Sequence, residues 1–156
     1  MRFEVVMAEP RPMLYLTRTA TMEPRDVEAI MGEAFGAIGA FLATSGVIPA
    51  GPPIAVYRDW DMKTGTMKID LGFPVVSGDV PKASGGVHSG TTPAGKALKA
   101  VHHGPYRKLR DTYGALEAHM KQRGMPMSAM AWEVYVSDPD KTPEADLVTE
   151  VYMALP

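Results

Sequence analysis

The chain has 156 residues, no cysteine, and 16 basic against 18 acidic side chains, which gives a net charge of −2. This length suits a single domain that buries roughly two-thirds of its unfolded surface, and the absence of cysteine excludes disulfides and thiolate metal sites. No nucleic-acid partner is expected, because binding to phosphates requires a basic face. No membrane contact is expected either, because no apolar run reaches the ~20 residues that span a bilayer. Charged Glu4 and Glu9 interrupt the N-terminal apolar stretch, which therefore does not resemble a signal peptide, and we expect a cytoplasmic protein.

Helical and strand periodicities alternate along the chain. Apolar residues recur at helical spacing in two segments, each with a proline at its start and a glycine just past its end. Short extended segments surround them, and one alternates apolar with polar residues as a half-buried strand does. In chain order, the sequence predicts a strand over 13–20, a helix over 24–45 and strands over 54–59 and 67–76, then a strand over 96–103, a helix over 105–123 and strands over 131–137 and 147–153.

The order of these elements repeats, and so do some of their residues. The matched residues lie first 81 and then 78 positions apart: Pro12 and Pro93, Pro24 and Pro105, Phe35 and Leu116, then Gly46 and Gly124, Tyr57 and Tyr135. A three-residue difference in the proline-rich turn at 49–53 would account for the change. We therefore predict one α+β domain over 1–156, built from tandem β-α-β-β units (1–80 and 81–156) with pseudo-twofold symmetry, antiparallel sheets and a ligand cleft between the halves. The Ser- and Gly-rich segment 77–92 is the expected joint.

The repeat is broken at Glu133. Tyr135 matches Tyr57, but Glu133 occupies the position of Ala55 in the first half. A carboxylate in the middle of an apolar strand is costly to ionise if buried and unpaired, and no lysine or arginine lies nearby in the sequence. Glu133 is therefore a candidate functional charge; the alternative is that it lies on a solvated strand face.

Several side chains could surround a ligand beside this carboxylate. Aromatic faces stabilise flat cations, and the chain's 12 methionines either fill gaps in the core or line an adaptable pocket. The predicted ligand-binding residues are Glu133, Tyr135, Tyr57, Trp132, Tyr113 and Met130. No metal or other cofactor is expected, because His102 and His103 point to opposite faces of a strand and the glycines at 85–90 lack the setting of a phosphate loop.

A longer pattern covers the second half. It reads H-x-G-x-Y-x-x-L, then a helix ending in glycine, then W-E-x-Y-x-x-D-P and a short last strand; here its residues are His102, Gly104, Tyr106, Leu109, Gly124, Trp132, Glu133, Tyr135, Asp138 and Pro139. This pattern resembles the GyrI-like effector-binding domains, over about 55 residues strongly and over the N-terminal half weakly. Such domains occur alone, as in the DNA gyrase inhibitory protein, and fused to DNA-binding helices in AraC-type and MerR-type multidrug regulators.

The resemblance implies a cleft between two related halves, in which a glutamate at the position of Glu133 pairs with lipophilic cations. No helix-turn-helix accompanies the domain here, so direct DNA binding is not expected. The leading hypothesis is a stand-alone protein that senses or sequesters apolar, often cationic, small molecules. One alternative is a hydrolase of electrophilic cyclopropane compounds, with Glu133 as general base and Tyr113 or Tyr57 polarising the departing group. The other is a protein-interaction module like the gyrase-inhibiting member, a role that a shared fold alone does not establish.

Overall fold

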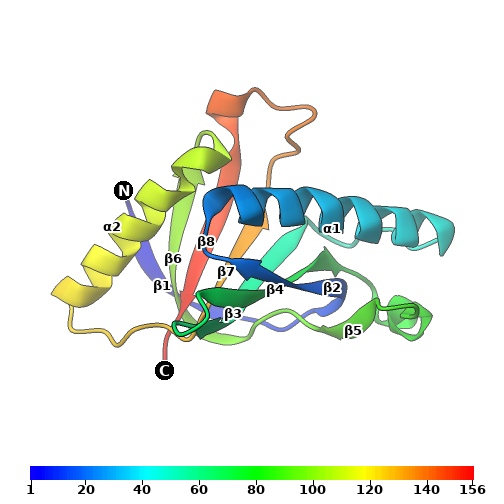
Figure 1. Cartoon of the computed structure of the whole chain (residues 1–156), viewed down its shortest axis with the longest axis horizontal. Coiled ribbons are helices and arrows are strands. Elements are labelled where there is room, and N and C mark those ends of the chain that lie inside the picture. The colour runs from blue at the N-terminus through cyan, green and yellow to red at the C-terminus, as the bar shows by residue number, and fades with distance from the viewer.

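The computed structural model describes all 156 residues as an eight-stranded antiparallel sheet with two helices on one face (Figure 1). The predicted helices and strands are all present, and strands β1 and β5 are additional. The elements are β1 (Phe3–Ala8), β2 (Pro12–Thr21), α1 (Pro24–Thr44), β3 (Ile54–Asp61), β4 (Thr66–Pro74), β5 (His88–Thr91), β6 (Gly95–His103), α2 (Leu109–Gln122), β7 (Met130–Tyr135) and β8 (Val148–Ala154). Short 3-10 helices cover Ser77–Lys82, Tyr106–Lys108 and Glu144–Asp146.

The strand order confirms the predicted duplication. It runs β1-β6-β8-β7-β3-β4-β2-β5, so the two halves meet where β3 pairs with β7. In that pair Ala55 lies directly opposite Glu133, its counterpart in the repeat. The pseudo-twofold axis therefore passes between these two residues.

The two additional strands exchange between the halves. β1 is the first strand of the first half but pairs with β6 of the second, and β5 is the first strand of the second half but pairs with β2 of the first. The segment 77–92 is therefore more than a joint, because it contains a 3-10 helix and an edge strand. Each half is closed by a strand that belongs, in sequence, to the other.

The helices match one another at a single offset. Each buries one residue per turn against the sheet, and the buried residues lie 78 positions apart: Ala34, Ile38 and Leu42 in α1, and Thr112, Leu116 and Met120 in α2. Leu116 therefore corresponds to Ile38, and its predicted match with Phe35 is wrong. The helices differ at their N-terminal ends: α2 has 14 residues against 21 in α1, and it begins after a 3-10 turn.

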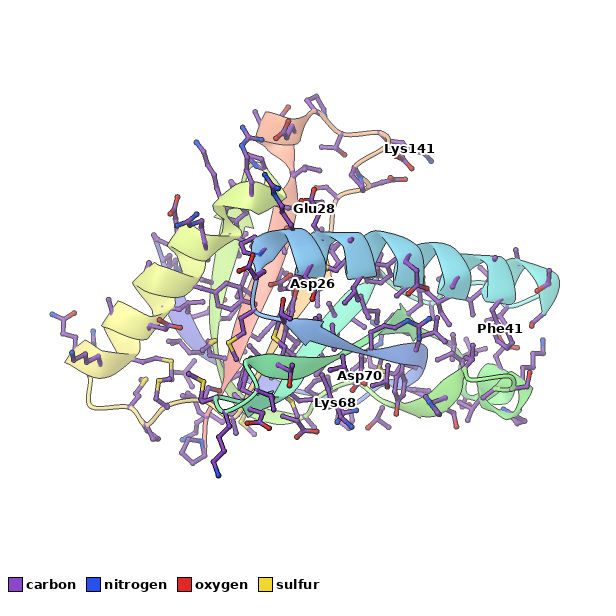
Figure 2. The ribbon with its side chains drawn as sticks, viewed as in Figure 1. Asp26, Glu28, Phe41, Lys68, Asp70 and Lys141 are labelled. Atoms are coloured by element: carbon purple, nitrogen blue, oxygen red, sulfur yellow. The ribbon has the colours of Figure 1, made fainter.

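Helix α1 is tied to the end of β2 by its own first turn. Asp26 accepts hydrogen bonds from the backbone N–H and the hydroxyl of Thr21, at 2.7 and 3.0 Å, and lies beside the start of α1 in Figure 2. An acidic side chain in the first turn also favours the positive end of the helix dipole. By length and composition alone, α1 is the one helix that could cross a membrane. Its inner residues pack on the sheet.

The sheet buries side chains on both faces. Clusters beneath the helices include Ala55, Tyr57 and Ile69 under α1, and Leu98, Ala131 and Val151 under α2. A separate cluster on the opposite face is formed by Met13, Ile54, Val56, Ala97 and Trp132. Adjacent residues of a strand therefore belong to cores on opposite faces of the sheet. Only those predicted site residues that share a face can contact one another.

Candidate functional site

Glu133 lies on the helix-facing side of β7 with only 3% of its surface exposed. Three tyrosine hydroxyls donate hydrogen bonds to its carboxylate. Tyr113 donates to Oε2 at 2.6 Å, while Tyr135 and Tyr57 donate to Oε1 at 2.5 and 3.2 Å. The structure thus brings together four of the six predicted ligand-binding residues.

The strand pairing explains why two tyrosines reach the same oxygen. Tyr57 lies two residues after Ala55, and Tyr135 lies two residues after Glu133, so each points to the same face as its predecessor. Because Ala55 and Glu133 face each other across the axis, the two tyrosines approach from symmetric positions. The longer glutamate side chain stands where the first half has only a methyl group. Tyr113 arrives independently, from the first turns of α2.

The carboxylate has no basic partner. None of the six salt bridges in the structure involves Glu133. Burial raises the pKa of Glu133, whereas the hydrogen bonds from Tyr113, Tyr135 and Tyr57, and then the nearby His102, act to lower it. Burial dominates, since a carboxylate loses its hydration in this environment.

The tyrosines remain hydroxyl donors at neutral pH. Burial, followed by the charge of Glu133, raises the pKa values of Tyr57, Tyr113 and Tyr135 well above that of an exposed tyrosine. Their hydroxyls therefore stay protonated beside the carboxylate. The site is a buried carboxyl group with three neutral hydroxyl donors and no salt-bridge partner.

Apolar side chains close over this cluster. The sulfur of Met31 in α1 lies 3.7 Å from the Tyr57 hydroxyl and 3.9 Å from that of Tyr135. The rings of Phe35 and Tyr106 each lie roughly perpendicular to the Tyr135 ring, with centroids 5.8 and 5.6 Å from it. Tyr106 is 37% exposed. It is therefore an aromatic neighbour of the buried cluster that reaches the surface.

His102 holds the start of α2 in place. It is buried, with Nδ1 2.7 Å from the Thr112 hydroxyl and Nε2 3.0 Å from the Pro105 carbonyl oxygen. Since a carbonyl only accepts, Nε2 is the donor in the second bond. These two bonds fix the segment that carries Tyr106 and the helix that carries Tyr113.

Trp132 and Met130 are not part of the cluster. Strand alternation places them on the opposite face from Glu133. There the Trp132 ring stacks on Tyr152, with centroids 5.1 Å apart and planes at 7°. Their predicted contact with a ligand at Glu133 therefore has no support from their positions.

The comparison with known families is decisive for the domain type. The whole chain, residues 1–156, matches the model of the GyrI-like small molecule binding domain. This protein belongs to the GyrI-like family. No match was found among curated proteins.

Solved structures share the fold of this GyrI-like domain at low sequence identity. The EcmrR C-terminal domain superposes with a TM-score of 0.82 at 18% identity, covering 99% of this chain and 97% of that one. SAV2435 bound to tetraphenylphosphonium has a TM-score of 0.70 at 12% identity, covering 100% and 94%. A hydrolase encoded by lin2189 from Listeria innocua has a TM-score of 0.61 at 14% identity, covering 99% and 92%.

Two surface depressions of the GyrI-like domain do not include Glu133 in their lining. One is polar and lies between β1, β6 and the start of α2, where Arg2, Lys99 and Lys108 contribute to its lining. The other lies on the opposite face of the sheet and includes Trp132 and Tyr152. Because Glu133 is buried, a ligand that touches its carboxylate must displace the side chains that cover it.

Sequence reasoning missed four side chains on this face: Met31, Phe35, Trp60 and Thr149. The first two lie in the helical stripe of α1, but their rotation toward Glu133 depends on how the helix packs. Thr149 lies across from His102 and Tyr135 in the neighbouring strands, fully buried, and its hydroxyl has no hydrogen-bond partner. No pattern in the sequence of β8 indicates that Thr149 lies beside the site.

Proposed function

We propose that this GyrI-like domain binds bulky apolar cations, with Glu133 as the charge that recognises them, and thereby senses or sequesters such molecules. The observation that carries the proposal is the buried carboxylate, which accepts three tyrosine hydrogen bonds and has no basic partner. A charge in this state is stabilised by any cation that reaches it.

The surroundings of Glu133 favour a lipophilic cation over a small hydrated one. A ligand with delocalised charge loses little hydration on entering an apolar site, whereas a compact ammonium loses much. The rings of Tyr57, Tyr113 and Tyr135 supply aromatic faces for such a charge. The presence of tetraphenylphosphonium in the SAV2435 structure supports this choice of ligand class.

Access requires the covering side chains to move. Met31 is flexible and unbranched, and its sulfur contacts only the tyrosine hydroxyls at hydrogen-bonding range. Tyr106 already reaches solvent. A ligand that enters beside Tyr106 and displaces Met31 replaces the thioether contacts with its own apolar surface.

Hydrolysis is the second candidate function. The Tyr113 hydroxyl lies 2.6 Å from Glu133 Oε2, and the fold is shared with the lin2189 hydrolase. In this scheme Glu133 takes a proton from water, and a tyrosine hydroxyl polarises the departing group of an electrophilic substrate. The raised pKa of Glu133 suits a general base. The three hydrogen bonds that it accepts in this structure oppose that role, because they stabilise the unprotonated form.

Binding of two ions of the same shape tests the proposal. Tetraphenylphosphonium and tetraphenylborate differ in the sign of their charge but little in size, and their binding is measured by calorimetry at pH 8, because a higher pH favours the ionised carboxylate. We expect the wild type to prefer the cation. Glu133→Gln should weaken binding of the cation by about 1–3 kcal/mol, the scale of losing a charge-assisted contact. It should not weaken binding of the anion.

A matched variant separates recognition from net charge. Glu150 lies on the opposite face of the sheet and pairs with Lys99, so Glu150→Gln removes the same charge without touching the site. Equal losses of cation affinity in the two variants would contradict the proposal. If neither ion binds, yet an electrophilic cyclopropane is consumed with turnover that Glu133→Gln abolishes, the protein is a hydrolase.

A further inference from the structure

Strand β3 contains an irregularity that changes the direction of one aromatic side chain. Arg58 pairs with Lys68 and Asp61 pairs with Thr66, so both Asp59 and Trp60 lie opposite Met67. Two residues opposite one define a β-bulge. Asp59 has a φ of 53° and is the one non-glycine residue in the chain with a positive φ. The bulge therefore depends on a backbone conformation that aspartate tolerates better than most residues do.

The bulge reverses the face that Trp60 occupies. Strict alternation from Val56 and Arg58 would place Trp60 on the side of the sheet opposite Glu133. Instead, Trp60 packs against the cluster beneath α1, which includes Tyr57 and Met67, and also against the cluster beneath α2. It is the one partly buried side chain that packs against both of these clusters. Trp60 therefore lies on the helix-facing side, where the two halves meet.

This feature has no counterpart in the second half. The residue 78 positions after Trp60 is Asp138, which lies beyond the end of β7 in an exposed loop. The second half thus supplies the carboxylate, and the first half supplies a large aromatic side chain on the same face. Bulges commonly occur beside functional sites, where they redirect a side chain.

We infer that Trp60 is a ligand-contacting wall of the Glu133 site and that Asp59 is the residue that positions it. The inference rests on the proposed function and specifies the ligand class further: a cation that carries at least one flat aromatic ring. Tryptophan is the strongest aromatic partner of a cation, and its flat face also stacks on aromatic rings. Trp60 is only partly buried, so its ring keeps surface that a ligand can cover.

The chain provides its own control, because its two tryptophans lie on opposite faces of the sheet. Trp132→Phe leaves Trp60 as the sole tryptophan emitter, and Trp60→Phe leaves only Trp132. Titration with tetraphenylphosphonium should produce a saturable change in emission in wild type and in Trp132→Phe, and none in Trp60→Phe. Trp60→Leu should reduce the affinity for tetraphenylphosphonium about tenfold, the scale of a desolvated cation–π contact.

Two substitutions at Asp59 test the positioning role. Asp59→Gly permits the positive φ and should keep both the emission change and the affinity. Asp59→Val opposes that conformation, since β-branched residues rarely adopt a positive φ. It should shift Trp60 emission and reduce cation affinity about as much as Trp60→Leu. Circular dichroism of each variant verifies that it is folded.

The outcomes distinguish this inference from the proposed function. If calorimetry shows Glu133-dependent binding of tetraphenylphosphonium while the emission change persists in Trp60→Phe, the role of Trp60 is wrong and the proposed function stands. If Asp59→Val binds as well as Asp59→Gly, the positioning role of Asp59 is wrong. If the wild type does not bind the cation by calorimetry, the proposed function fails and the inference fails with it.

Discussion

Removal of the Tyr113 hydroxyl should destabilise the protein more than removal of the Tyr57 hydroxyl. Tyr113 is the one donor to Glu133 Oε2, at 2.6 Å. Tyr57 donates over 3.2 Å to Oε1, which also accepts the shorter bond from Tyr135. Tyr113→Phe therefore leaves a buried carboxylate oxygen without a partner, whereas Tyr57→Phe leaves both oxygens bonded.

The expected magnitudes follow from this difference. A hydrogen bond to a charged group contributes about 1.5–3 kcal/mol, and a neutral one about 0.5–1.5 kcal/mol. Tyr113→Phe should thus lower the free energy of unfolding by about 1.5–3 kcal/mol when Glu133 is ionised, and Tyr57→Phe by less than about 1 kcal/mol. In a Glu133→Gln background, Tyr113→Phe should lower the free energy of unfolding by only about 0.5–1.5 kcal/mol, the contribution of a neutral hydrogen bond.

The pH dependence has a definite sign. The pKa of Glu133 is raised in the folded protein, so its contribution to stability is greatest below its unfolded pKa of about 4.3 and declines as the pH rises through the folded pKa. Tyr113→Phe removes an interaction that lowers this pKa. The loss of stability with rising pH should therefore be larger in the variant, and the difference from wild type should grow with pH.

Urea unfolding followed by circular dichroism, at several pH values, measures these free energies. The four proteins of a double-mutant cycle are wild type, Tyr113→Phe, Glu133→Gln and the double variant. Additive effects at high pH would refute the argument, because the hydroxyl would then not act through the carboxylate. Equal costs for Tyr57→Phe and Tyr113→Phe would refute the ranking taken from the distances.

Two further predictions concern stability. The Thr149 hydroxyl is fully buried and has no hydrogen-bond partner, so Thr149→Val, which keeps the shape, should be neutral or should raise the free energy of unfolding by up to about 1–3 kcal/mol. A clear loss of stability would show that the hydroxyl has a partner in solution. Gly36 lies on the exposed face of α1, where an added Cβ meets nothing within 4 Å, so Gly36→Ala should stabilise the helix by about 0.5–1 kcal/mol. Thermal unfolding checks this, and a lower Tm would show that the position is covered in solution.

The local parts of the fold follow from the sequence. Both helices and six of the eight strands are visible as periodicities, because burial of one face imposes a repeat of 3.6 or 2 residues. The short edge strands β1 and β5 are not visible, since few of their side chains are buried. Their exchange between the halves depends on pairing with residues far away in the chain, which no local pattern records.

Part of the site can also be predicted from patterns in the sequence. The duplication identifies Glu133 as the residue that differs from Ala55, and alternation places Tyr57 and Tyr135 on the corresponding faces. By the same alternation Trp132 belongs to the opposite face, so its proximity to Glu133 along the chain does not bring it into the site. The sequence by itself therefore determined the carboxylate and the symmetric pair of tyrosines.

The tertiary structure decided the rest. Tyr113 and Met31 reach the cluster because of how α2 and α1 are rotated on the sheet, and that rotation is set by packing of the whole helix. Trp60 joins this face because one residue, Asp59, adopts a positive φ and shifts the alternation of β3. Periodicity assumes a regular backbone, so it fails at a bulge. Helix rotation and strand register are set by contacts between distant segments, and only the folded chain brings those segments together.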